Sequence, residues 1–298
     1  MRNRVPAVVL AVALVSALAL LAAPAVASGG SGKVTRLAAT LSGANEVPGP
    51  GDPDGRGRAF VRLAGDKACY ALEWSKIGAP TAAHIHTGKA GVAGPVVVLF
   101  FEPGTNAASL PDTLSSVAGC VDVDPAVARK IAAKPRDFYV NIHTADFAPG
   151  AIRGQLRRSA HVDLDLPRQL VAGLNGANEF PGPGDPDGRG LALVGTGRER
   201  VCFALGWTGI APPIFAHIHV GAAGVAGPVV VLFFDVPELA ATPPASLPAT
   251  VAAAGGCVGD QDPALLRDIR RHPGSYYVNI HTPEFVPGAI RGQLRRLT

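Results

Sequence analysis

Apolar side chains recur at every second residue in short segments along most of the chain. In residues 33–43, Leu37, Ala39 and Leu41 alternate with polar or small neighbours. A period of two is typical of a β-strand with one buried face. Glycine and proline separate such segments at short intervals, as they do in sandwiches and barrels. Further strands are therefore expected in the first half at 56–65, 68–77, 81–88, 94–102, 137–144 and 150–158.

One helix is expected in each half of the chain. Asp124 and Asp262 each precede a proline, which is the pattern of an N-cap followed by the first helical position. The segments PAVARKIAA and PALLRDIRR follow, and Pro135 and Pro273 are expected to stop them. The predicted fold class is all-β: two tandem Greek-key-like sandwich or barrel domains, each with one short helix before the penultimate strand.

The chain contains two copies of one sequence repeat. ANEVPGPGDPDGRG at 44–57 returns as ANEFPGPGDPDGRG at 177–190, an offset of 133 residues. The offset grows to 138 between His143 and His281, so the second copy has gained five residues, mostly in a proline- and alanine-rich loop. We therefore expect a first domain at 34–158, a linker at 159–167 and a second domain at 168–297.

The first 27 residues have the features of a secretory signal peptide. Arg2 and Arg4 precede an apolar stretch, and Ala25-Val26-Ala27 fits a small-residue cleavage site. A retained membrane anchor is the alternative, but the apolar run is short and breaks at Pro24. The protein is expected to be secreted, with no membrane span after cleavage.

Removal of this signal changes the charge argument. Two of the 27 basic residues leave with it, and 25 remain against 23 acidic residues, a net charge of +2. No basic patch with interleaved aromatic residues stands out. A nucleic-acid partner is therefore not expected.

The four cysteines divide two per repeat, as Cys69 and Cys120 and then Cys202 and Cys257. Cysteines in a secreted chain suggest disulfides, and one bridge inside each repeat is the simplest of three pairings. Thiolate metal ligands are the competing interpretation, but the close C-x-x-C spacing of a zinc knuckle is missing.

Histidines are concentrated in a repeated phrase. AHIH at 83–86 and again at 216–219 holds four of the eight histidines in the chain. Residues two apart on a strand share a face, so each pair points away from the apolar side of its strand. The NIHT segment of each copy adds a third histidine on the corresponding face. If the two strands are neighbours, three imidazoles converge in each domain, at His84, His86 and His143 and at His217, His219 and His281.

Three neutral imidazoles suit zinc or copper and leave one coordination position open. The alternative is structural: histidines on an outer sheet face also hydrogen-bond a covering loop. The sequence leaves both interpretations standing. His161 and His272 do not recur between the copies and are expected at the surface.

A carboxylate and an arginine recur near the two ends of each copy, as Glu46 with Arg153 and Glu179 with Arg291. Because terminal strands often pair, we expect a structural ion pair that ties the ends together. In the alternative, the arginines lie beside the histidines and guide an anion to a metal.

Four motifs together resemble the CHRD domain, a repeat first described in chordin. They are the N-E-x-P segment, the A-H-I-H…G-x-x-G-x-x-G-P phrase, the Y-V-N-I-H-T strand and the closing G-x-I-R-G-Q-L strand, and the resemblance covers nearly all of both copies. It implies a compact, mostly β extracellular module and little about activity.

The favoured function is a non-catalytic extracellular binding or scaffold protein, because two similar modules suit bivalent attachment. Its partner would be an extracellular protein or a cell-surface polymer. The alternative is an extracytoplasmic copper- or zinc-binding protein, or a metalloenzyme similar to superoxide dismutase, which also carries a His-x-His pair. No nucleophile–base motif such as G-x-S-x-G is present, so no catalytic residues are assigned.

Overall fold

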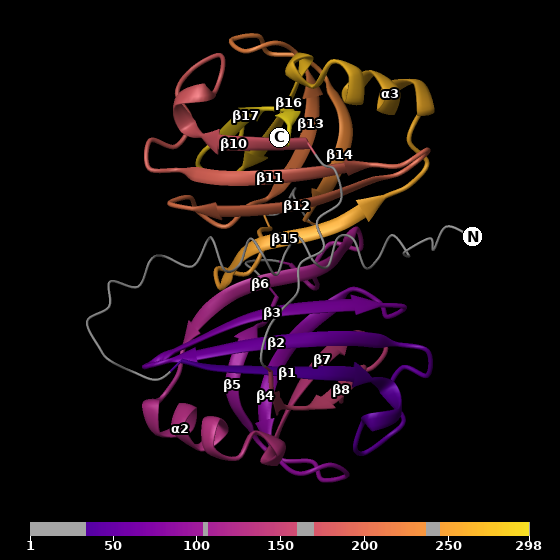
Figure 1. Cartoon of the computed structure of the whole chain (residues 1–298), viewed down its shortest axis with the longest axis vertical. Coiled ribbons are helices and arrows are strands. Elements are labelled where there is room, and N and C mark those ends of the chain that lie inside the picture. Colours follow the sequence, from indigo (N-terminus) through magenta and orange to yellow (C-terminus); the bar gives the residue numbers. More distant parts are fainter. Residues whose placement is uncertain (1–33, 104–106, 160–169, 237–244, 298) are drawn as a thin grey trace.

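The computed structural model describes residues 34–103, 107–159, 170–236 and 245–297. The expected signal peptide, residues 160–167 of the expected linker and His161 lie outside these ranges. The described chain forms two similar β-sandwich domains, one built from β1 to β9 and the other from β10 to β18 (Figure 1). The predicted all-β fold with a tandem repeat is confirmed.

Domain 1 consists of two antiparallel sheets. The first has the strand order β1 (Thr35–Ser42), β2 (Arg56–Ala64), β3 (Lys67–Ser75), β6 (Leu114–Asp122). The second has the order β5 (Val96–Phe101), β4 (Pro80–Thr87), β7 (Phe138–Thr144), β8 (Ile152–Gln155). The two sheets join along one side, where β1 pairs with β8 and with the short β9 (Arg157–Arg158).

Domain 2 repeats this arrangement. Its first sheet has the order β10 (Leu170–Asn175), β11 (Arg189–Thr196), β12 (Val201–Thr208), β15 (Val251–Val258). Its second sheet has the order β14 (Val229–Asp235), β13 (Phe215–Val220), β16 (Tyr276–His281), β17 (Ile290–Gln293), and β18 (Arg295–Arg296) pairs with β10.

Alternation along the strands fills the core between the two sheets. Leu37, Leu41, Ile85 and Val140 are at most 1% exposed. The helices α2 (Pro125–Ala133) and α3 (Pro263–Arg271) lie at the far ends of the two domains in Figure 1. Each begins at its expected aspartate cap, whose carboxylate accepts a hydrogen bond from a backbone N–H of the first turn. None of the described helices combines the length and apolar character needed to cross a bilayer.

Two details of the predicted strand order need correction. The expected last strand of each copy is interrupted at Leu156 and Leu294, so the helix precedes the third strand from the end. In addition, β6 and β15 were not expected. Their sequences, LSSVAGCVD and VAAAGGCV, are rich in small residues and lack polar alternation, because most of their side chains are buried on both faces of the sheet.

These two unexpected strands join the domains. β6 and β15 pair antiparallel, so the first sheets of both domains form one continuous sheet (Figure 1). Gly119 permits the close approach, because a Cβ atom there would lie 1.8 Å from the carbonyl oxygen of Thr250. The hydroxyl of Tyr70 donates to that same oxygen at 3.2 Å. Apolar side chains from both domains also form a common cluster on this sheet.

The cysteines form one disulfide within each domain, as predicted. Cys69–Cys120 links β3 to β6, and Cys202–Cys257 links β12 to β15. The residues of each bridge are separated by 51 and 55 positions along the chain, respectively. In the chain-entropy model, closing a loop of this length stabilises a domain by about 4 kcal/mol. Both bridges fasten the strands that carry the joint between the domains.

Candidate metal site

The pairing of β4 with β7 determines where the histidines of domain 1 lie. His84 is opposite Asn141, His86 is opposite Tyr139, and His143 is opposite Ala82, two residues from His84. The neighbouring Ile85 and Ile142 point into the core and are fully buried. The imidazoles therefore project from the other face of the sheet, as the alternation predicts.

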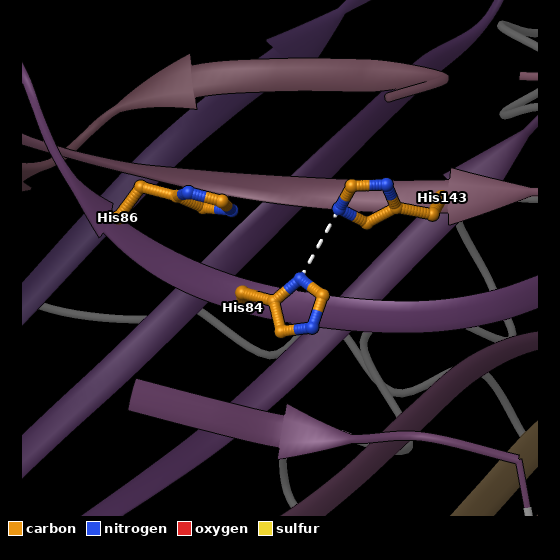
Figure 2. Close-up of side chains that lie close together, drawn as sticks. All are labelled: His84, His86 and His143. Carbon is orange, nitrogen blue, oxygen red and sulfur yellow. Dashed lines mark hydrogen bonds between the residues drawn. The ribbon is translucent and has the colours of Figure 1, made fainter. Parts of the chain in front are cut away.

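On that face the three rings converge. Figure 2 shows His84 and His143 facing each other, with Nδ1 of His84 3.1 Å from Nε2 of His143. One nitrogen from each of His84, His86 and His143 lies within 4.8 Å of the other two. Two imidazole nitrogens on a tetrahedral zinc ion are separated by roughly 3.3 Å, given bonds of about 2.0–2.1 Å. The separation of 3.1 Å between His84 and His143 is close to this spacing, and His86 completes a group of three within 4.8 Å.

Backbone carbonyls determine the tautomer of His86 and His143. The Nδ1–H groups of His86 and His143 donate to the carbonyl oxygens of Gly94 and Ala148, each at 2.8 Å. A carbonyl only accepts, so Nε2 of each neutral ring carries a lone pair. Nε2 of His86 is buried and has no hydrogen-bond partner. Carbonyl partners of this kind orient metal-binding imidazoles in known sites.

Domain 2 builds the same arrangement. Nδ1–H of His219 donates to Gly227, and Nδ1–H of His281 donates to Val286, each at 2.7 Å. Nδ1 of His217 and Nε2 of the other two rings are buried without a partner. One nitrogen from each of the three rings lies within 4.8 Å of the other two. We call His84, His86 and His143 cluster 1, and His217, His219 and His281 cluster 2.

Burial keeps the clustered rings neutral. It lowers the pKa of His84 to about 4, with further lowering by the adjacent His143 and His86. It lowers the pKa of His217 to about 2 and that of His281 to about 4. Burial is also the main reason why the pKa values of the other three rings are lowered. Neutral imidazole is the form that binds a metal, so no proton has to leave at neutral pH.

A glycine-rich loop after β4, residues 88–95, covers one side of cluster 1. Arg153 holds this loop: its Nη2 donates to the carbonyl oxygens of Lys89 and Val92 at 3.0 and 2.7 Å. Its guanidinium also lies 3.4 Å from the ring centroid of Tyr139. The Tyr139 ring in turn stacks on His86 with a centroid separation of 4.8 Å. Arg153 is therefore a positioning residue for the loop carbonyl that orients His86.

The expected ion pair between Glu46 and Arg153 does not form a direct salt bridge. No contact between these two charges within 4.0 Å occurs in the described part of the chain, and Glu46 accepts a hydrogen bond from Asn141 at 3.0 Å instead. Glu179 and Arg291 follow the same pattern, with Asn279 as the donor at 3.2 Å. Nη2 of each arginine donates to the carbonyls of its loop, and the ends of each copy are tied by pairing of β1 with β8 and of β10 with β17.

Burial also raises the pKa of each of these carboxyl groups. The pKa of Glu46 and that of Glu179 rise to about 7, although the nearby arginine and asparagine lower them in part. Arg153 acts on its surroundings through space as well, since its charge contributes to the lowered pKa of His86. The arginine thus acts on the histidines, and its role in guiding an anion to a metal stays a prediction.

One residue beside the clusters differs between the domains and was missed from the sequence. Phe215 lies opposite His281 in domain 2, where domain 1 has Ala82 opposite His143. The Phe215 ring packs on His281 and His217, with centroid separations of 4.3 and 5.3 Å. His217 and His281 are only 7% and 4% exposed, whereas all three rings of cluster 1 are half-buried. Comparison of the two copies at the offset of 133 residues would have shown this exchange.

The remaining described histidine lies apart from both clusters. His272 is exposed at the end of α3 and pairs with Asp268 at 2.8 Å, consistent with the expected surface position. Its single carboxylate partner is the ordinary environment of a surface imidazole.

Comparison with known proteins identifies the domains. The CHRD domain family model matches residues 37–156 and 170–294, which together cover more than half of the chain. No curated protein matches the sequence. Both matches contain the complete histidine cluster of their domain. The chain therefore belongs to the CHRD domain family and carries two copies of the domain in tandem.

Proposed function

We propose that this protein is an extracytoplasmic metal-binding protein that holds one copper or zinc ion in each domain. One observation carries the proposal. In both domains three neutral imidazoles present nitrogens within 4.8 Å of one another, and in cluster 2 one nitrogen of every ring is buried without a partner. A buried polar atom without a partner carries a free-energy penalty, and a metal ion at the centre of the cluster would remove three penalties together.

The type of ligand favours copper and zinc over other metals. Imidazole nitrogen suits both ions, whereas magnesium and calcium prefer oxygen ligands. Disulfides and the family match both fit an extracellular protein, and the features of residues 1–27 support secretion. In this setting the protein would bind or buffer copper or zinc outside the cytoplasm.

Metal content per chain tests the proposal. Protein made without a histidine tag is loaded with Cu(II) or Zn(II), desalted and measured by elemental mass spectrometry. We expect two ions per chain, one in the His84→Ala variant and one in the His217→Ala variant. The double variant should retain none, while the matched control His272→Ala should retain both ions. Near-ultraviolet circular dichroism checks that the variants remain folded.

Two results would count against metal binding. One is a folded wild-type protein that takes up neither ion. The other is a double variant that keeps its metal, because the ligands would then lie elsewhere in the chain.

The second candidate function is a non-catalytic binding or scaffold protein. It is favoured by apolar side chains that are exposed at matching places in both domains, on the loop and edge strand beside each cluster: Val92, Val96 and Leu99, and Val225, Val229 and Leu232. Two such surfaces on joined domains suit attachment to an extracellular protein or a cell-surface polymer. If the protein binds neither copper nor zinc, this second function remains.

A further inference from the structure

The two clusters have corresponding histidines but differ in access from solution. Three imidazoles leave at least one coordination position on copper or zinc for an outside ligand. In domain 1 the residue opposite His143 is Ala82, whose methyl group leaves the half-buried rings accessible. In domain 2 the corresponding Phe215 packs on two of the three rings and leaves them less than a tenth exposed.

Charge near the clusters favours an anion in the open position. Neutral imidazoles leave both charges of a divalent ion uncompensated. Arg153 adds a fixed positive charge close to His86, although Glu46 offsets part of it. The guanidinium is 1% exposed, and its Nη1 has no hydrogen-bond partner. An anionic ligand is therefore more favourable at this site than water or a neutral one.

We infer that the two sites have different roles: the metal in domain 1 exchanges its outer ligand for small inorganic anions, and Phe215 excludes such anions from the metal in domain 2. This inference rests on the proposed metal binding. The step is a ligand substitution without electron transfer. A metal-bound water leaves with its electron pair, and a lone pair of the anion forms the new bond.

Azide binding to copper tests this difference in access. Two proteins with a single site are loaded with Cu(II): His217→Ala keeps only cluster 1, and His84→Ala keeps only cluster 2. Each is titrated with sodium azide, and the azide-to-copper charge-transfer band is followed together with the copper content. We expect cluster 1 to bind azide and cluster 2 to bind it at least about tenfold more weakly, because the phenyl ring obstructs the approach.

Reciprocal exchanges at Ala82 and Phe215 serve as matched variants. Ala82→Phe in the cluster 1 protein should weaken azide binding by about tenfold, and Phe215→Ala in the cluster 2 protein should strengthen it by a similar factor. Wild-type protein with two coppers should bind one azide per chain with high affinity. This last measurement needs no substitution and remains valid if a variant fails to fold.

Copper content separates the two kinds of failure. Equal azide affinity in two proteins that each hold one copper would overturn the inference and leave metal binding intact. The same holds if the wild-type chain binds two azides with equal affinity. Absence of copper from folded wild-type protein would overturn both.

Discussion

Clusters 1 and 2 have the same three histidines, the same carbonyl partners and the same stacked tyrosine and arginine. They differ in the residue that faces the third histidine, which is Ala82 in domain 1 and Phe215 in domain 2. Their surroundings differ accordingly, since burial lowers the pKa of His217 to about 2 and that of His84 only to about 4.

This comparison separates what a metal site needs from what it tolerates. Ligands and their hydrogen-bond partners must be retained together, because each carbonyl determines which nitrogen is presented. A neighbour that touches only the rings can change while those hydrogen bonds are kept. The spacing of the rings shifts with it, since the centroids of the first two histidines are 5.5 Å apart in cluster 1 and 4.6 Å apart in cluster 2. Tandem copies of one domain can therefore keep a common ligand set while their access to solvent diverges.

The largest effect on stability is expected in the glycine-rich loop that follows the first histidine strand of each domain. Gly94→Ala would place a Cβ atom 1.8 Å from the carbonyl oxygen of Thr87, and Gly227→Ala would place one 1.6 Å from that of Val220. Because backbone must move, each substitution should destabilise its own domain by roughly 3 kcal/mol. Displacing the loop carbonyl should also weaken metal binding in that domain about tenfold or more.

Urea unfolding followed by fluorescence measures this effect in each domain. The two tryptophans divide between the domains, as Trp74 in β3 and Trp207 in β12, so Trp→Phe variants report one domain at a time. Gly91→Ala is the control, because its Cβ meets nothing within 4 Å and only its φ of +79° is unfavourable, at about 1 kcal/mol. Equal costs for Gly94→Ala and Gly91→Ala would show that the close contact is unimportant.

Sequence patterns predicted much of this architecture, for identifiable reasons. Alternation in β1 and in the AHIH strands defines a buried and an outer face, and Asp124 and Asp262 mark the helix starts. The joint between the domains was not predictable in this way. β6 and β15 are covered on both faces and rich in alanine and glycine, so they lack the polar alternation that identifies a strand.

The site was likewise predictable where local strand patterns determine it and not where distant segments meet. Strand periodicity placed the histidines on one face, but the register that sets His143 two residues from His84 depends on pairing between distant strands. The expected pairing of Glu46 with Arg153 takes the form of an interaction through space and not of a direct contact, and Nη2 of the arginine donates to the backbone carbonyls of the loop. Such an arrangement is visible only once the loop has a position in space.

A smaller effect is expected at the position where the domains differ. Phe215→Ala removes a partly buried ring from cluster 2 and should destabilise metal-free domain 2 by about 1–2 kcal/mol, less than for a fully buried phenylalanine. Ala82→Phe should change the stability of domain 1 by no more than about 1 kcal/mol, in the favourable direction if the ring stacks on His143. The same fluorescence assay measures both, and the comparison fails if Ala82→Phe destabilises domain 1 as much as Phe215→Ala destabilises domain 2.

The smallest expected effect is a pH dependence of stability that should be the same in both domains. Glu46 and Glu179 each have a pKa raised from 4.5 to about 7, chiefly by burial, with Arg153 or Arg291 and an asparagine as the facing groups. A raised pKa means that the folded state holds the proton more tightly than the unfolded state. The stabilising contribution is therefore complete below pH 4.5 and is lost as the pH rises through 7.

Histidine effects overlap with this one, and comparison with a glutamine variant removes them. The histidine pKa values are lowered from 6.5, so the unfolded chain still binds protons at pH 6.5, and stability from this source rises towards pH 8.5. Glu46→Gln keeps these histidines, so the difference in unfolding free energy between wild type and variant isolates the carboxyl group. Between pH 6.5 and 8.5, metal-free domain 1 should lose about 1 kcal/mol of stability relative to Glu46→Gln, and domain 2 the same amount relative to Glu179→Gln. Urea unfolding followed by Trp74 and Trp207 fluorescence across this range provides the test. A difference that stays constant would assign the pH dependence to another group, and a change in only one domain would extend the difference between the domains beyond Ala82 and Phe215.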